Sequence, residues 1–255
     1  MEDFENAKDK VMMGAERRSM VRTKKQIEKT AYHEAGHAVV GISLPECDPV
    51  YKATVIARGG ALGMVVSLPE IDRLNWQKNE CEQKLAMTMA GKAAEIIKYG
   101  EDNVSNGPSG DIQQASSLAR AMVMRWGMSD KVGNIDYTEA HQGYGGQGAG
   151  GFSISAKAKE TIEDEVKTLI DRGYDLAKKI LLEKNDEFER LALGLIEYET
   201  LTGDEIKKIM AGEPLNRGSD EEGGSAASGG NTTSVTAIPK TAKPKSSGLE
   251  PEPSA

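Results

Sequence analysis

The stretch "YHEAGHAVVG", residues 32–41, places two histidines four positions apart, with a glutamate directly after the first. On a helix, residues at this spacing project from the same face, so the imidazoles of His33 and His37 can both reach one tetrahedral metal ion. Glu34 is offset by one residue, from where it can accept a proton from water during attack on a carbonyl. The motif HEAGH (33–37) predicts a zinc protease site. The alternative is a pair of core histidines that are hydrogen-bonded to backbone carbonyls.

The helix that carries this motif is predicted to be buried. Thr23 followed by Gln26 is typical of a capping box at a helix start. Gly36, beside the second histidine, leaves space for a substrate or a neighbouring strand. The small and apolar residues of this helix are Ala31, Ala35, Ala38, Val39 and Ile42. Buried imidazoles need partners for their ring nitrogens, and a metal provides one.

A catalytic zinc usually takes three protein ligands, so a third must come from elsewhere in the chain. His141, the only other histidine, lies in the glycine-rich segment 141–151 and is a poor rigid ligand. Glu70, Glu95 and Asp111 are the carboxylate candidates. Asp111 opens a helical segment after a loop, where it can either reach towards another helix or simply cap its own. Spacing alone leaves these alternatives open.

Outside the motif, helical periodicity dominates the chain. It covers residues 3–12, a segment from about 76 to 99, the segment from 111, a long stretch around 162–181, and a pair over 186–210 that is broken near Thr202. Two short strands, 51–57 and 63–69, flank "RGGAL", whose glycines suit a tight turn. The predicted fold is mainly α, a helical zinc metallopeptidase domain with a small β-sheet beside the active-site helix.

Composition excludes several classes of function. A net charge of −8 over 255 residues argues against a nucleic-acid partner, and the basic cluster 22–29 is expected to form the solvated face of a helix. Cys47 and Cys81 suit neither a disulfide scaffold nor a cysteine zinc site. The apolar stretches are too short to cross a bilayer, so the polypeptide alone is expected to be soluble and cytoplasmic.

The C-terminal residues 213–255 are predicted to be a disordered tail. Gly, Pro, Ser and Thr supply 22 of the last 42 residues, so this segment has too little apolar surface to offset its ordering entropy. A further functional hypothesis, which rests on composition alone, is a non-enzymatic adaptor that partners recognise through this tail.

Five motifs together resemble one known family. "TAYHEAGHAVV", "RGGALGMVVSLPE", "MAGKAAE", "SGDIQQASSLARAMVMRWGMSD" and "LIEYETLTGDEIKKIM" follow one another in the order seen in FtsH-type ATP-dependent zinc metalloproteases. The resemblance covers about residues 1–212. It implies a linker over 1–22 that is similar to the end of an AAA+ lid, and a zinc metallopeptidase domain over 23–212. Ile96 stands where the family often carries a second glutamate, a departure that bears on substrate preference rather than zinc chemistry.

The resemblance also implies roles for particular residues. His33, His37 and Asp111 would hold one zinc ion per chain, Glu34 would be the general base, and Glu95 would support a ligand. The segment Gly60, Ala61, Leu62, Gly63, Met64 and Val65 would bind an extended polypeptide substrate along a strand edge.

The family further implies a homohexamer, with subunit contacts in the helical region 155–210. The full-length protein would sit at the bacterial inner membrane, with this domain on the cytoplasmic side. ATP would bind only in an AAA+ module, because this sequence holds no GxxxxGK[ST] loop. The alternative is a catalytically silent, hexamer-forming structural module with the same ligand residues.

Overall fold

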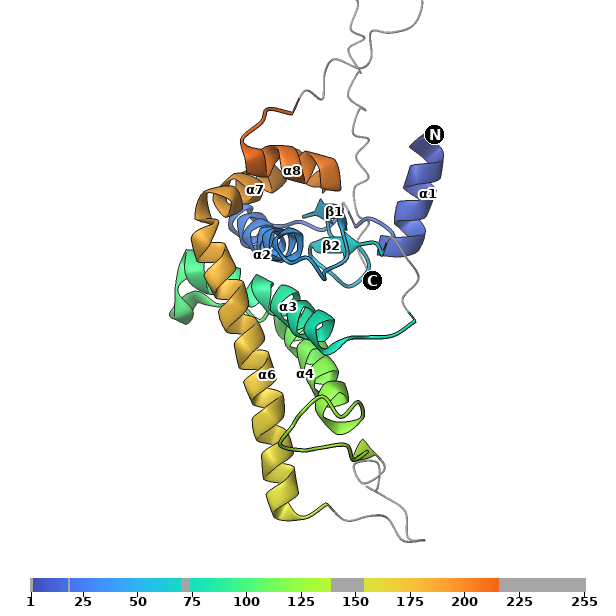
Figure 1. Cartoon of the computed structure of the whole chain (residues 1–255). Helices are drawn as coiled ribbons and strands as arrows, with labels where there is room; N and C mark the ends of the chain where they lie inside the picture. The colour runs from blue at the N-terminus through green and yellow to red at the C-terminus, as the bar shows by residue number, and fades with distance from the viewer. Residues whose placement is uncertain (1, 18, 70–73, 139–153, 216–255) are drawn as a thin grey trace, which may run out of the picture. The chain divides into compact units, whose positions relative to one another are not determined.

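The computed structural model describes residues 2–17, 19–69, 74–138 and 154–215, and Figure 1 shows a mainly helical structure with a small sheet beside α2 (Lys24–Ser43). Its elements are α1 (Glu2–Met13), α2 (Lys24–Ser43), β1 (Val50–Thr54), β2 (Met64–Ser67), α3 (Lys78–Tyr99), η1 (Glu101–Asn103), α4 (Ser109–Met124), α6 (Ala156–Glu183), α7 (Asn185–Tyr198), β3 (Thr200–Thr202) and α8 (Gly203–Ala211). The mainly α fold with a small sheet is confirmed. Glu70, His141 and residues 216–255 of the predicted tail lie outside the described residues.

Helix α2 runs through the main core. The Thr23 side chain accepts a hydrogen bond from the Gln26 amide, and the Gln26 side-chain oxygen accepts one from the Thr23 amide, so the predicted capping box is confirmed. The alanines of α2 are fully buried against those of α3. Gly36 serves this contact, because a Cβ there would lie 2.6 Å from the Cβ of Ala94. The expectation that Gly36 leaves room for substrate or a strand is therefore wrong: it makes room for α3.

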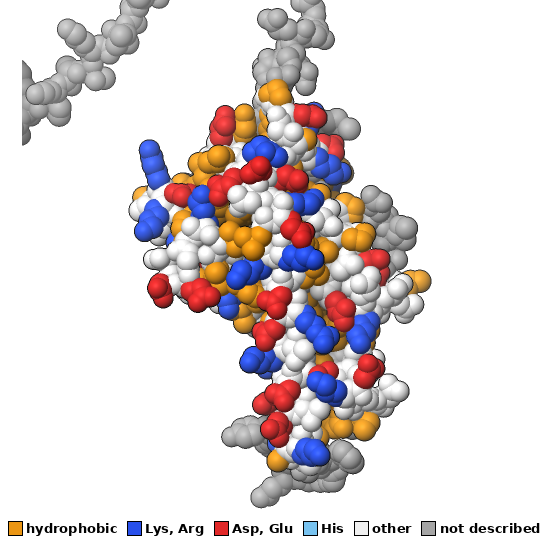
Figure 2. Space-filling view, turned by 60° about the vertical axis from the view of Figure 1, so that its left-hand side comes forward, with side chains coloured by type: hydrophobic (Ala, Val, Ile, Leu, Met, Phe, Trp, Pro, Cys, Tyr) orange, Lys and Arg blue, Asp and Glu red, His pale blue; other side chains and the backbone are white. Residues whose placement is uncertain are grey.

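A second core lies between α3, α4 and α6. Its buried residues include Leu85, Met122 and Leu169, and full burial of such a side chain contributes about 1.5–3 kcal/mol. Figure 2 shows acidic and basic side chains interleaved along the outer side of the lower part of α6. Helix α3 contributes to both cores and so fixes the position of α2 relative to α4 (Figure 1).

The sheet has the strand order β2-β1-β3, and both pairings are antiparallel. Arg58 and Ala61 exchange two backbone hydrogen bonds across a tight turn, and Gly59 has a φ of +54°, as the glycines predicted. The strands are shorter than the sequence predicts, since β1 ends at Thr54. Strand β3 was not predicted, because its three residues give too little alternation to distinguish it from a loop.

No helix among the described stretches is long and apolar enough for a membrane crossing.

Candidate active site

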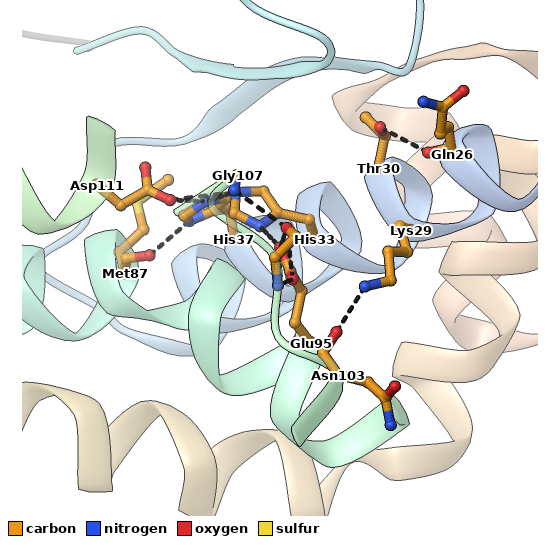
Figure 3. Close-up of polar contacts among 11 residues, drawn as sticks. Gln26, Lys29, Thr30, His33, His37, Met87, Glu95, Asn103, Gly107 and Asp111 are labelled. Carbon is orange, nitrogen blue, oxygen red and sulfur yellow. Dashed lines mark hydrogen bonds and ion pairs between the residues drawn. The ribbon is translucent and has the colours of Figure 1, made fainter. Parts of the chain in front are cut away.

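His33 and His37 lie one turn apart on α2 (Figure 3), and their rings meet edge to face, with an angle of 75° between the ring planes. The ring centroids are 4.8 Å apart, and the two Nε2 atoms are 3.1 Å apart. Both residues are largely buried, because α2 crosses α3 at this point. A Cβ at Gly91 of α3 would lie 2.4–2.6 Å from the two imidazoles, so only glycine leaves room for them.

Asp111 points at both histidines from the first turn of α4 (Figure 3). Its Oδ2 lies 3.1 Å from Nε2 of His33 and 3.4 Å from Nε2 of His37. The helix begins at Ser109, two residues before the predicted start, and its N-cap is Pro108. Asp111 is therefore not an N-cap, and of the two candidates that the structure describes, Glu95 and Asp111, it is the one whose oxygen meets both Nε2 atoms.

The outer ring nitrogens of the two histidines have their own partners. Nδ1 of His37 lies 2.8 Å from the carbonyl oxygen of Met87, and Nδ1 of His33 lies 3.1 Å from Oε1 of Glu95. When the neutral rings donate from Nδ1, both Nε2 lone pairs face Oδ2 of Asp111. This oxygen is buried without a hydrogen-bond donor. Two nitrogens and one carboxylate oxygen that converge in this way match the donor set of a zinc site.

The electrostatics of the cluster favour a positive charge between these side chains. Burial alone would lower the pKa of His33, but the nearby carboxylates of Asp111 and Glu95 favour its protonated form, outweigh burial and raise that pKa to about 10. Burial would raise the pKa of Asp111, and the two histidines instead hold it well below its usual range. A cation, whether a proton or a metal ion, satisfies this arrangement.

Glu95 of α3 connects His33 to the loop that leads to Asp111. Its carboxylate accepts hydrogen bonds from the amide and the hydroxyl of Ser105, both at 2.9 Å, in addition to the contact with His33. Burial would raise the pKa of Glu95, but these bonds outweigh it and lower the pKa. The contacts with Ser105 and His33 therefore keep Glu95 ionised and fix its orientation, and Glu95 in turn positions the His33 ring.

Glu34 lies on the same turn of α2 and is 6% exposed. Burial raises the pKa of its carboxyl group, although the neighbouring histidines act in the opposite direction. A raised pKa brings a carboxylate closer to the range in which it can take up and return a proton. The residue predicted to be the general base is therefore buried next to the histidine cluster, and its pKa is raised.

A cleft of about 920 Å³ opens over the cluster, and its lining includes His33, Glu34, His37, Glu95 and Asp111. Residues 60–65, the predicted substrate-binding segment, also line it. Only Met64 and Val65 of these belong to β2, because residues 60–63 complete the turn before the strand. Strand β2 is an edge of the sheet, so one side of it is without a partner strand among the described residues.

Two contributors to the site were missed by sequence reasoning. Met87 acts through its carbonyl oxygen, which any residue type would provide, so no side-chain pattern signals it. Gly91 acts through the absence of a side chain. The small residues of "MAGKAAE" (89–95) were a usable signal, since such a run on a helix indicates close approach of another element.

Comparisons with known proteins agree with this geometry. The family model for peptidase family M41 matches residues 20–209. Relatives described as "ATP-dependent zinc metalloprotease FtsH" include proteins from Caulobacter vibrioides (46% identical, 87% of this chain and 36% of the relative), Rickettsia bellii (46%, 87% and 34%) and Haemophilus influenzae (44%, 84% and 34%). The chain spans about a third of the length of these curated relatives. From the extent of the family match and its agreement with the sequence motifs, we conclude that the chain belongs to peptidase family M41.

Proposed function

We propose that this chain is a zinc metalloendopeptidase domain in which His33, His37 and Asp111 hold the metal. The observation that carries the proposal is the convergence of their three donor atoms at the base of a cleft that Glu34 and an edge strand also line. Zinc, when bound, supplies Lewis-acid polarisation of the scissile carbonyl and makes water more acidic.

In this proposal the residues of the chain divide the remaining work. Glu34 takes a proton from the attacking water and returns it to the leaving amine, which its raised pKa supports. Glu95 and the Met87 carbonyl hold the imidazoles so that both Nε2 atoms face Asp111. An extended polypeptide lies along residues 60–65 and pairs with the edge of β2 through its main chain, which suits cleavage of many sequences.

The wider assembly is also a proposal, supported by what the relatives are called. The chain would form the proteolytic part of a longer ATP-dependent protease, with ATP bound in an AAA+ module. The proposal also includes a homohexamer with contacts in 155–210, unfolded or membrane proteins as substrates, and a place at the bacterial inner membrane, as the family resemblance of the sequence motifs implies. Residues 1–22 would link the two modules.

Glu34→Gln tests catalysis directly. We expect the zinc-loaded variant to lose cleavage of unfolded casein while its zinc content and oligomer size stay unchanged. Glu28→Gln is the control, since Glu28 lies on the same helix and does not line the cleft. Full zinc content without any cleavage by the unmodified chain would instead support a silent structural module.

A further inference from the structure

The turn between β1 and β2 is held by the segment that precedes α2. The backbone amide of Arg17 donates to the Ala57 carbonyl at 2.8 Å, and the amide of Gly59 donates to the Ala15 carbonyl at 3.3 Å. The guanidinium of Arg17 adds a bond to the Gly59 carbonyl at 3.0 Å. Residues 14–17 therefore lie along one arm of the turn.

Arg22 spans the two ends of this turn. Its Nη2 donates to the carbonyl of Val55 at 2.6 Å, and its Nη1 donates to the carbonyl of Leu62 at 2.9 Å. The guanidinium is planar and its donors have fixed directions, so one side chain sets the separation of the two carbonyls. The expectation of a solvated basic cluster holds for Lys24 and Lys25, which are exposed. It is wrong for Arg22 and for Lys29, which is part-buried and donates to the Asn103 carbonyl.

The held turn lies directly against Glu34. A Cβ at Gly63, the residue after Leu62, would lie 2.7 Å from Oε1 of Glu34 and 2.4 Å from Cγ2 of Thr30. This contact stops the turn from moving towards α2, and the Arg22 bonds stop it from moving away. The position of residues 60–63 relative to the cleft thus depends on both.

We propose that Arg22 is a positioning residue for substrate: it orders the turn before β2 so that an extended polypeptide meets a preformed edge. The inference rests on the proposed function, because it assumes that residues 60–65 bind a polypeptide. Without Arg22, the turn would become ordered only when substrate binds. The conformational entropy lost in that step would make the binding free energy less favourable. When Arg22 is present, its side chain couples the segment 14–22 to the strand that would bind substrate.

The first measurement is amide hydrogen exchange of residues 55–64 in the full chain. We expect Arg22→Ala to accelerate exchange there, and Arg22→Lys to have a smaller effect, because an ammonium lacks the planar guanidinium geometry that spans both carbonyls. Arg190→Ala is the matched control. Arg190 also donates two guanidinium bonds, both to the Met210 carbonyl, and it does not line the cleft.

The second measurement is the affinity for a labelled casein-derived peptide, made with zinc in a Glu34→Gln background so that nothing is cleaved. We expect Arg22→Ala to weaken binding about tenfold, Arg22→Lys to restore part of the loss, and Arg190→Ala to leave affinity unchanged. Unchanged exchange, or unchanged affinity with faster exchange, would overturn the proposal. Failure of the unmodified chain to cleave casein would count against the proposed function alone, because peptide binding is measured separately.

Discussion

Two parts of the cleft lining are held in different ways. The ligand wall, formed by His33, His37, Glu95 and Asp111, is fixed by charged and polar contacts among its own members and the nearby loop. The strand wall is formed by residues 60–65. It is fixed by the hydrogen bonds that Arg22 donates to the carbonyls of Val55 and Leu62, and by contact with α2. We therefore expect changes in the ligand wall to weaken metal binding, and changes in the strand wall to weaken polypeptide binding without loss of the metal.

The largest effect is expected from removing a ligand. Asp111→Ala deletes the only carboxylate that meets both Nε2 atoms among the described residues, so we expect zinc affinity to fall at least about a hundredfold. Metal content after dialysis against a weak chelator measures this. Asp102→Ala, an exposed aspartate in η1, should keep the zinc. Equal zinc content in the two variants would show that Asp111 is not a ligand.

Gly91→Ala is expected to disrupt the ligand wall by crowding. The added Cβ would overlap both imidazoles, so we expect zinc loss and a fall of about 1–3 kcal/mol in the free energy of unfolding. The matched control is Gly110→Ala on α4, where a Cβ would meet nothing within 4 Å. For Gly110→Ala we expect the free energy of unfolding to stay the same or to rise by up to about 1 kcal/mol. Urea unfolding and metal analysis check both.

Gly63→Ala is the corresponding test of the strand wall. The added Cβ would push the turn away from Glu34 and Thr30 while leaving the ligand atoms in place. We expect zinc content to stay unchanged and the cleavage rate to fall about tenfold. Steady-state cleavage of casein together with metal analysis gives the answer. Zinc loss comparable to that of Gly91→Ala would show that the two walls are not independent.

The smallest effect concerns a carboxylate away from the cleft. Hydrogen bonds from Lys131 and Ser129 lower the pKa of Glu165 below its ordinary 4.5. Its stabilising contribution is therefore present above about pH 4.5 and lost as the pH falls through the lowered value. Lys131 is 69% exposed, so we expect Glu165→Gln to cost less than about 1 kcal/mol at pH 7. Urea unfolding at pH 7 and near pH 3 should show the difference between the variants shrinking in acid.

Local sequence was sufficient for the features that depend on neighbouring residues. The spacing of His33 and His37 placed both rings on one face of α2, and the capping box at Thr23 and the predicted break near Thr202 marked where α2 and α8 begin. Helix α3 ends at Tyr99, where the predicted helical segment ends, and Gly100 follows it with a φ of +79°. Each of these features is set by backbone geometry and hydrogen bonds within about one helical turn, so the residue types alone contain the information.

Only the tertiary structure decided how distant segments meet. Asp111 remained one of several candidates until the crossing of α2, α3 and α4 brought its oxygen to both histidines, and only then did Gly91 acquire its importance. Strand β3 and the two Arg22 bonds likewise depend on partners far away in the sequence. Such contacts depend on how whole helices pack, and packing is a property of the assembled core that no short stretch of sequence contains.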